Sequence, residues 1–129
     1  MALLPHQPEW LDQLFACIDN RDADAFCGFL LEEATFRFGN ADAVRGRTAI
    51  RDYVAGFFAS IAAVEHRIEE RWTVDGAVIC SGRVTYTRLD GSTLSAPFAN
   101  ILKLGAADTR AAVRDYLIFV DASALYATA

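Results

Sequence analysis

The sequence predicts an α+β domain in which helices pack on one face of a curved antiparallel sheet. Apolar residues recur at helical spacing over roughly the first sixty residues. From residue 64 onward the period changes to two, along runs rich in β-branched and aromatic residues. Two Asp-Gly pairs, Asp75-Gly76 and Asp90-Gly91, divide this second half, and Asp-Gly supplies the positive φ angles of tight hairpin turns.

Three helices are expected, with one strand ahead of the third. Residues 9–19 carry an amphipathic stripe, and Asp22 is the expected N-cap of a second, short helix. The second helix is expected to carry Phe26, Phe29 and Leu30. Residues 34–38 alternate as a strand that ends at a Gly-Asn pair. The third helix covers residues 46–61, with its apolar side chains on one side: Ile50, Tyr53, Val54, Phe57, Phe58 and Ile61.

Four longer strands are expected in the second half, over residues 64–74, 78–89, 93–104 and 112–121. Pro97 cannot donate to a strand ladder, so an edge, a bulge or a bend is expected there. Strict alternation would place on one face of the first of these strands His66, Ile68, Glu70, Trp72 and Val74. Residues 122–129 are expected to form a short cap or a tail.

The last strand has large apolar groups on both faces. One face carries Tyr116, Ile118 and Val120, and the other carries Asp115, Leu117, Phe119 and Asp121. Neither face is suited to water, so we expect one to line the interior beneath the helices and the other to meet a second subunit. The sequence therefore predicts a homodimer formed through the sheet face.

The composition fits one compact domain. The chain has 129 residues, of which 53% are hydrophobic and 22% charged, so we expect a single domain over residues 1–129 with a substantial core. The net charge is −5 at pH 7. Because nucleic-acid phosphates attract Lys and Arg, this charge argues against nucleic acid as a partner.

Other sequence signals bear on location and on bound groups. No apolar stretch approaches the ~20 residues that span a bilayer, and the first ten residues lack a signal-peptide pattern. The three cysteines form no C-x-x-C pair, which fits a reducing compartment. His6 and His66 are too far apart in sequence for a metal motif, and no glycine-rich phosphate loop is present. We expect a cytoplasmic protein without membrane contact, metal or cofactor.

Four segments of the sequence form a recognisable set: Phe36-Arg37-Phe38-Gly39-Asn40, Val44-Arg45-Gly46-Arg47-Thr48-Ala49-Ile50, Thr85-Tyr86-Thr87-Arg88-Leu89-Asp90-Gly91 and Pro97-Phe98-Ala99-Asn100. Together they resemble the SnoaL-like branch of the nuclear transport factor 2-like superfamily, over residues 9–126. The resemblance implies a cone-shaped α+β barrel, with three N-terminal helices closing over a curved sheet around a deep apolar pocket, and often a dimer. This superfamily includes isomerases, cyclases, dehydratases, epoxide hydrolases and binding modules, so the resemblance alone names no reaction.

Two catalytic patterns of this superfamily are incomplete in the chain. The ketosteroid isomerase pattern needs a tyrosine, an aspartate base and a protonated aspartate, and these positions fall on Leu14, Phe38 and Asn100. Phe38 cannot act as a base, and Leu14 cannot donate a hydrogen bond. The limonene epoxide hydrolase pattern needs two aspartates bridged by an arginine, and Phe98 and Asn100 stand where the arginine and one aspartate are expected. A cyclase needs only one acid or base, usually an aspartate, in an apolar pocket.

Asn100 and His66 are two of the candidate catalytic residues. Asn100 shares a strand face with Phe98 and Leu102, so we expect its amide in the pocket. There it would either polarise a ligand carbonyl or satisfy a neighbouring polar group. His66 is the candidate proton carrier because histidine titrates near neutral pH, and its alternative role is structural, at the start of a strand.

Asp115 and Asp121 are the candidate carboxylates. Asp115 is expected across the hairpin from Asn100, where burial would raise the pKa of a carboxylate and suit it to acid or base chemistry. A register slip of one residue would instead place Asp115 at a sheet surface, in a salt bridge with Arg114 or Arg83. Asp121 is either a second such carboxylate or the N-cap of a tail helix.

The residues expected to line the ligand pocket are mostly aromatic. They are Phe15, Phe36, Phe38, Tyr53, Phe57, Trp72, Tyr86, Phe98, Leu117 and Phe119. Such a lining suits a small apolar or aromatic ligand, and the alternative is that these rings only fill a core.

Three functions remain open at this point. The leading one is binding of a hydrophobic or polyketide-like molecule, with cofactor-free isomerisation, cyclisation or dehydration if the protein is an enzyme. Asp115 or Asp121 would then move the proton, and Asn100 would polarise the substrate. The second function is a non-catalytic ligand-binding or dimerisation module. The third is an interaction adaptor that uses the outer face of the sheet for a partner protein.

Overall fold

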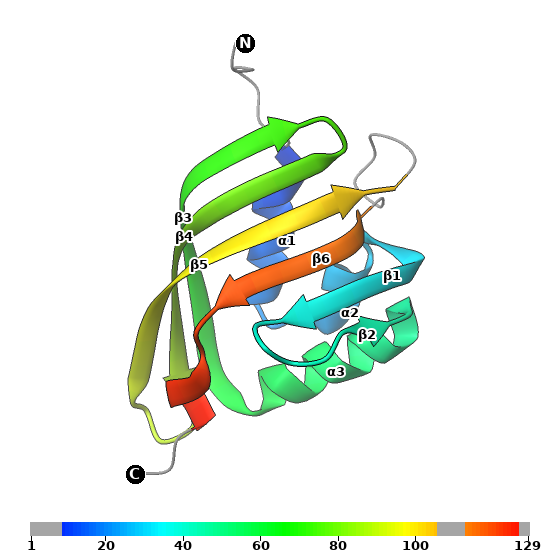
Figure 1. Cartoon of the computed structure of the whole chain (residues 1–129). Helices are drawn as coiled ribbons and strands as arrows, with labels where there is room; N and C mark the ends of the chain where they lie inside the picture. Colours follow the sequence, from blue (N-terminus) through cyan, green and yellow to red (C-terminus); the bar gives the residue numbers. More distant parts are fainter. Residues whose placement is uncertain (1–8, 106–112, 127–129) are drawn as a thin grey trace.

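The computed structural model describes residues 9–105 and 113–126 of the chain. Within these residues the elements follow one another as labelled in Figure 1: α1 (Glu9–Asp19), α2 (Ala23–Cys27), β1 (Leu30–Phe38), β2 (Val44–Arg45), α3 (Arg47–Ala59), β3 (Ile61–Val74), β4 (Ala77–Arg88), β5 (Thr93–Leu104), β6 (Val113–Val120) and the 3-10 helix η1 (Ser123–Tyr126). None of the described helices is both long enough and apolar enough to cross a membrane.

Six strands form one curved sheet in the order β2-β1-β6-β5-β4-β3. The three α-helices lie on one face of this sheet, with α1 behind the long strands and α3 along the edge formed by β1 and β2 (Figure 1). This arrangement confirms the predicted α+β class. The sheet is mixed rather than purely antiparallel, because β1 and β6 run parallel to each other.

The two Asp-Gly turns lie where the sequence predicts them. Gly76 has a φ of 77° between β3 and β4, and Gly91 has a φ of 91° between β4 and β5. Glycine adopts this left-handed region without steric strain. The predicted N-cap is also confirmed, because the side chain of Asp22 accepts a hydrogen bond from the backbone N–H of Ala25 at 3.0 Å.

Some element boundaries differ from the sequence pattern. β1 begins at Leu30, so Leu30 belongs to a strand and not to the second helix. β2 is not predicted, since two residues are too few to show alternation. α3 ends at Ala59, and Ile61 already opens β3. The expected turn over residues 105–110 lies largely outside the described residues, as do residues 127–129 of the tail, whose start is η1.

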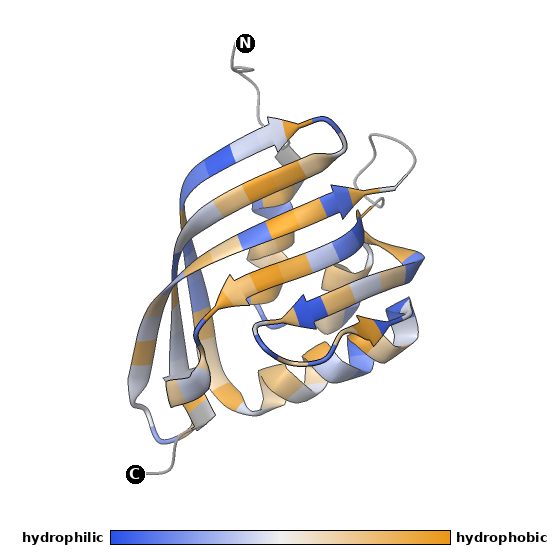
Figure 2. Ribbon diagram, in the orientation of Figure 1, coloured by the Kyte–Doolittle hydropathy of each residue, from blue (hydrophilic) through white to orange (hydrophobic). Residues whose placement is uncertain are grey.

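The core lies between the helices and the inner face of the sheet. Hydrophobic residues dominate the upper part of β4 and the arrowhead half of β6 in the view of Figure 2. The largest fully buried side chains come from both layers: Leu11, Leu14, Phe26, Phe29, Ile50, Leu102 and Tyr116. Each layer therefore buries its apolar face against the other, which is how such two-layer domains are stabilised.

A β-bulge in β3 changes which residues face the interior. Pairing with β4 shifts between Ile68, which lies opposite Gly82, and Glu70, which lies opposite Ser81. A Cβ atom on Gly82 would lie 1.9 Å from the Arg67 carbonyl oxygen, so only glycine fits here. The extra residue reverses the alternation, and Trp72 becomes 42% exposed. The expectation that His66 and Trp72 share a face is therefore wrong.

Candidate functional site

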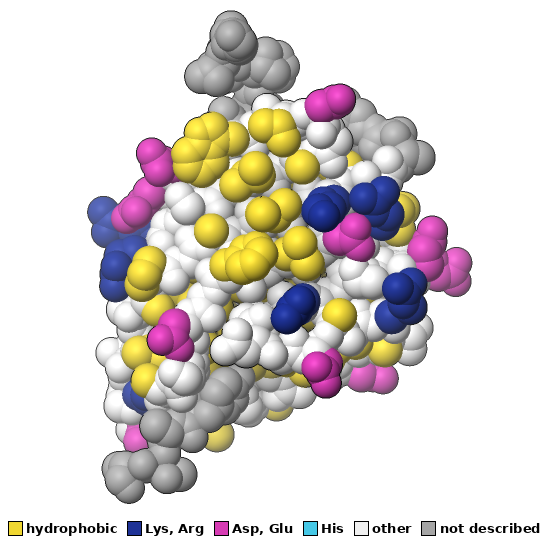
Figure 3. Space-filling view, in the orientation of Figure 1, with side chains coloured by type: hydrophobic (Ala, Val, Ile, Leu, Met, Phe, Trp, Pro, Cys, Tyr) yellow, Lys and Arg dark blue, Asp and Glu magenta, His cyan; other side chains and the backbone are white. Residues whose placement is uncertain are grey.

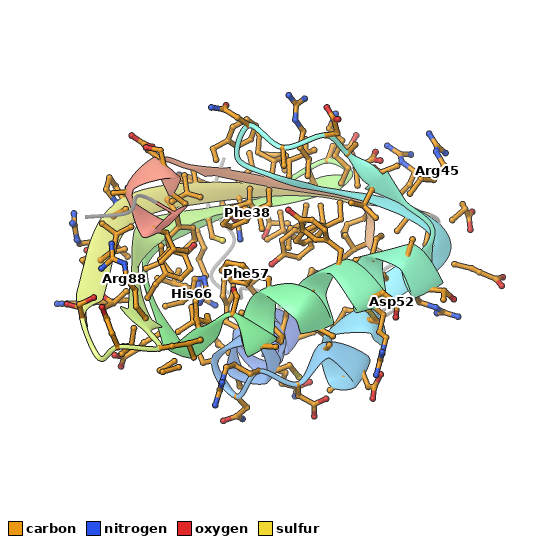
Figure 4. The ribbon with its side chains drawn as sticks, turned by 90° about the horizontal axis from the view of Figure 1, so that it is seen from below. Phe38, Arg45, Asp52, Phe57, His66 and Arg88 are labelled. Carbon is orange, nitrogen blue, oxygen red and sulfur yellow. The ribbon has the colours of Figure 1, made fainter. Side chains whose placement is uncertain are left out.

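A cavity of about 50 Å³ lies between α3 and the inner face of the sheet. Six of the ten predicted lining residues are in its walls: Phe36, Phe38, Tyr53, Phe57, Tyr86 and Phe98. Figure 4 looks into this region from below, with Phe38 on the sheet side, Phe57 on α3 and His66 beside them. A water molecule needs about 10–15 Å³, so the cavity has room for a few waters. A ring-sized ligand requires lining side chains to move.

Helical and strand periodicity explain this lining. Tyr53 and Phe57 are four residues apart in α3 and lie on the same side of the helix. Phe98 and Asn100 are two residues apart on β5 and face the same side of the sheet. The Phe57 ring contacts the Phe38 ring, with 5.3 Å between centroids. These side chains form the α3 side of the cavity wall.

A second, more open hollow adjoins the cavity and shares Phe38 and Tyr53 with it. The loop after β1 and the segment after β6, including Asp121 and Ser123, form the rest of this hollow. Phe38 and Tyr53 therefore lie between the cavity and the surface.

His66 lines the cavity and is held by a carboxylate from another part of the chain. Its Nδ1 lies 2.7 Å from Oδ1 of Asp19, and its backbone N–H donates to Oδ2 of the same residue at 3.1 Å. The side chains of His66 and Asp19 are 12% and 29% exposed. The rings of Phe15 and Phe98 pack against the imidazole, with centroids 4.9 and 5.2 Å away. The imidazole is thus fixed in position and in orientation.

The Asp19 contact determines which nitrogen of His66 can act as a base. An ionised carboxylate only accepts hydrogen bonds, so Nδ1 carries the proton and Nε2 of the neutral ring is left basic. If Nε2 gains a proton, the resulting imidazolium is stabilised by the Asp19 carboxylate, as in other carboxylate–histidine pairs. The pair therefore has the parts of a general acid–base unit.

Asp19 is absent from the residues predicted as a site. It lies 47 positions before His66, and no local motif links a helix end to a strand. One signal was available in the sequence. Asp19 is the last residue of α1, where the helix dipole disfavours a negative charge. In the structure the ring and the backbone N–H of His66 offset this unfavourable position.

Asn100 also lines the cavity, which confirms its predicted placement. It is the one buried polar residue of the described chain, at 2% exposure. Its Nδ2 donates a long hydrogen bond of 3.5 Å to the Tyr116 hydroxyl. Burial raises the pKa of Tyr116 well above its ordinary value, with the neighbouring Cys80 as a second cause, so the hydroxyl stays protonated. Among the described residues, none donates to Oδ1 of Asn100.

Asp115 lies on the outer face of the sheet and does not line the cavity. The register pairs Asn100 with Ile118 and Lys103 with Asp115, so the expected position across from Asn100 is wrong. The Asp115 carboxylate accepts hydrogen bonds from the Thr35 hydroxyl at 2.6 Å and from Arg114 at 3.0 Å. The Thr35 hydrogen bond is the main reason why the pKa of Asp115 is lowered, the reverse of the expected shift.

Asp121 is exposed and begins the short segment that follows β6. Its carboxylate accepts hydrogen bonds from the backbone N–H of Ser123 at 3.1 Å and from the Ser123 hydroxyl at 2.7 Å. These bonds lower the pKa of Asp121. The Asp121 carboxylate therefore forms a local turn with Ser123, the first residue of η1, and is not a second carboxylate in the cavity wall. Asp121 reaches only the outer hollow.

The remaining four predicted lining residues lie outside the cavity walls. Trp72, Leu117 and Phe119 are on the outer face of the sheet, so their predicted place in the pocket is wrong. The β3 bulge moves Trp72, and Leu117 and Phe119 alternate with the inward-facing Tyr116 and Ile118. Phe15 is buried behind the wall, where its ring supports His66.

No cluster of three or more metal-ligating side chains occurs in residues 9–105 and 113–126. The chemical groups that the cavity offers are therefore the imidazole of His66, the amide of Asn100, and the hydroxyls of Tyr53, Tyr86 and Tyr116. Among these groups the imidazole is the one held by a carboxylate, with Nδ1 2.7 Å from Asp19.

Solved structures with the same fold come from several organisms. A proposed SnoaL-like polyketide cyclase from Jannaschia sp. CCS1 is 16% identical with a TM-score of 0.72, over 97% of this chain and 94% of that one. A protein of ketosteroid isomerase-like fold from Catenulispora acidiphila DSM 44928, in complex with trimethylamine, is 15% identical with a TM-score of 0.77, over 88% and 86%. The epoxide hydrolase/cyclase-like enzyme SalBIII is 16% identical with a TM-score of 0.74, over 89% and 90%.

At these identities the structural neighbours establish the fold and not the reaction. No relative is found among curated protein sequences. The family itself is established by sequence. The sequence model of the SnoaL-like domain family matches residues 11–117, which is most of the chain. The protein therefore belongs to this family.

Proposed function

We propose that this SnoaL-like domain is a cofactor-free enzyme that moves a proton on a small hydrophobic or polyketide-like substrate. The reaction class is isomerisation, cyclisation or dehydration. One observation carries the proposal: the wall of an apolar cavity contains His66, whose Nδ1 lies 2.7 Å from the Asp19 carboxylate. Structural neighbours described as a proposed polyketide cyclase and as an epoxide hydrolase/cyclase-like enzyme support the same class.

In this mechanism Nε2 of His66 removes a proton from a carbon next to a carbonyl group. The C–H electron pair forms a C=C bond to the carbonyl carbon while the C=O π pair moves to the oxygen, and the imidazolium is stabilised by Asp19. His66 then returns the proton to another carbon in an isomerisation, or to a departing hydroxyl in a dehydration. The aromatic walls exclude water, while Asn100 and Tyr116 bind a polar group of the substrate.

The proposal replaces the carboxylates expected from the sequence with His66 as the proton carrier. Asp115 and Asp121 lie outside the cavity walls, and hydrogen bonds hold both as carboxylates. This arrangement also provides a matched control. Asp19→Asn and Asp115→Asn make the same chemical change, once beside His66 and once on the outer face of the sheet.

The test is proton exchange with solvent. A panel of one- and two-ring ketones and β-hydroxy ketones is incubated with the protein in D₂O, and deuterium incorporation or loss of water is followed by NMR. We expect His66→Gln to lower the rate about 100-fold or more, and Asp19→Asn about tenfold or more. Asp115→Asn should stay within about twofold of the wild type.

The second candidate function is a non-catalytic ligand-binding module. Its support is the small volume of the cavity and the absence of the two complete catalytic patterns considered above. For a binding module the wild type would catalyse no exchange on any member of the panel. His66→Gln would then change ligand affinity no more than Phe98→Ala does. Equal exchange rates in wild type and His66→Gln would also contradict the proposed enzyme.

A further inference from the structure

The side-chain oxygen of Asn100 has an unusual environment. Asn100 is 2% exposed and lies in the cavity wall. Its Oδ1 receives no hydrogen bond from any described residue, and it is the single buried side-chain atom of the described chain in this condition. Buried polar atoms in proteins are nearly always satisfied. An unsatisfied acceptor on a cavity wall therefore indicates the position of a ligand group that donates a hydrogen bond.

The amide nitrogen of Asn100, unlike its oxygen, already has a hydrogen-bond partner. Nδ2 of Asn100 points to the Tyr116 hydroxyl at 3.5 Å, and the hydroxyl oxygen accepts this hydrogen bond. The hydrogen of the Tyr116 hydroxyl is then available to donate. At this end of the cavity, one acceptor and one donor lie next to each other.

Few ligand groups match an adjacent acceptor and donor. A hydroxyl both donates and accepts, so it satisfies Asn100 and Tyr116 together. A ketone or an ether only accepts, and would leave Oδ1 of Asn100 without a donor. This selectivity depends on Oδ1 being the atom left without a partner, because with the amide turned over Nδ2 would be free and an ether or a ketone would satisfy it equally well.

The surroundings define the rest of the ligand. Phe98 precedes Asn100 by two positions on β5, a distance of about 7 Å along a strand, and both face the cavity. The Phe98 ring in turn contacts the His66 ring, with 5.2 Å between centroids. A flat ring that lies on Phe98 therefore has its polar end at Asn100 and its opposite edge toward His66.

We propose that the cavity binds a small hydroxylated ring, a phenol or a ring alcohol, whose hydroxyl donates to Oδ1 of Asn100 and accepts from the Tyr116 hydroxyl. This inference rests on the proposed function only for the chemistry at His66. The recognition of the hydroxyl can be tested without turnover. It also narrows the role of Asn100, from polarising a carbonyl to receiving a hydrogen bond.

The test compares three ligands of similar size: 4-ethylphenol, 4-ethylanisole and ethylbenzene. Their dissociation constants are measured by NMR titration of the full-length protein. We expect the phenol to bind about tenfold more tightly than the ether, because the ether cannot donate to Asn100. Asn100→Leu keeps the approximate volume, and should bring the three affinities within about threefold of one another.

Tyr116→Phe is the second variant, and it removes only the hydroxyl. It should reduce the preference for the phenol by a few-fold, which keeps the test decisive if Asn100→Leu does not fold. Equal binding of phenol and ether by the wild type would overturn the proposal. So would a preference that survives in both variants, or the failure of all three ligands to bind at millimolar concentration.

His66→Gln separates this inference from the proposed enzymatic function. The variant should keep the preference for 4-ethylphenol, since the imidazole is not part of hydroxyl recognition. A preserved preference without any proton exchange would mean that the cavity recognises hydroxyls but is not catalytic. Proton exchange without the preference would contradict only the present inference.

Discussion

The two faces of the same sheet differ in how their polar groups are used. On the inner face, His66 and Asn100 lie among aromatic rings and are directed at a cavity. On the outer face, Asp115 bonds to its neighbours Thr35 and Arg114. Both faces are rich in apolar side chains, so composition alone does not distinguish them. The pairing register of β6 and the bulge in β3 determine which carboxylates and aromatic rings face the cavity.

The outer face of the sheet carries a row of apolar side chains that runs across the strands. Strand pairing places one continuous row across four strands: Trp72, Ile79, Ile101 and Leu117. Phe119, which is 53% exposed, lies on the same face. Figure 3 shows apolar side chains gathered over β3 to β6. We propose that a second copy of the chain covers this row, since a contiguous apolar patch on a sheet is typical of an interface.

The largest effect on stability is expected at Gly82 of β4, which lies opposite the β3 bulge. This bulge determines which residues of β3 face the cavity and which face outward. A Cβ atom at Gly82 would lie 1.9 Å from the Arg67 carbonyl oxygen, so Gly82→Ala should lower the free energy of unfolding by about 2–4 kcal/mol. Chemical denaturation measures the loss. Gly56→Ala in α3 is the control, because nothing lies within 4 Å of the added methyl group and alanine favours helix. A tolerated Gly82→Ala would show that the bulge does not depend on glycine.

A charge on the outer face tests the dimer. Phe119→Asp would place a carboxylate beside the apolar row, and should shift the protein from dimer to monomer at micromolar concentration without unfolding it. Analytical ultracentrifugation gives the mass. Leu89→Asp is the matched control, since Leu89 is 70% exposed but lies in the β4–β5 turn, away from the row. A monomeric wild type would contradict the dimer and favour an adaptor with a different partner.

A smaller effect on the free energy of unfolding is expected from Asp115, the carboxylate on the outer face of the sheet. The pKa of Asp115 is lowered from 3.8, so its carboxylate stabilises the fold above that pH and the contribution is lost as the pH falls through the lowered value. Asp115→Asn should cost about 1 kcal/mol at pH 7, and the difference from the wild type should shrink below pH 4. Denaturation at several pH values checks this. A difference that grows on acidification would have the wrong sign.

Local patterns in the sequence predict the hairpins well. The Asp-Gly pairs mark both turns, and alternation along β5 places Asn100 beside Phe98 on the inner face. Between these two residues and the Asp90-Gly91 turn the pairing of β5 with β4 runs without a shift. Alternation in the sequence predicts which way a side chain faces only where the strand pairing contains no bulge.

The parts that the sequence does not predict depend on long-range pairing. The inward face of β6 is set by its parallel partner β1, which places Phe36 beside Tyr116, and nothing local to β6 reveals this. Trp72 is misplaced because Gly82, on another strand, allows the bulge. The contact between Asp19 and His66 joins a helix end to a strand. None of these contacts has a periodic signature.

The contact between Phe38 and Phe57 has a kinetic consequence. At about 50 Å³ the cavity is too small for a benzene ring, so these aromatic side chains must move before it can hold a ring-sized ligand. Association should therefore be slower than diffusion allows, and its observed rate should level off at high ligand concentration. Shortening Phe57 to leucine would speed both arrival and escape of the ligand.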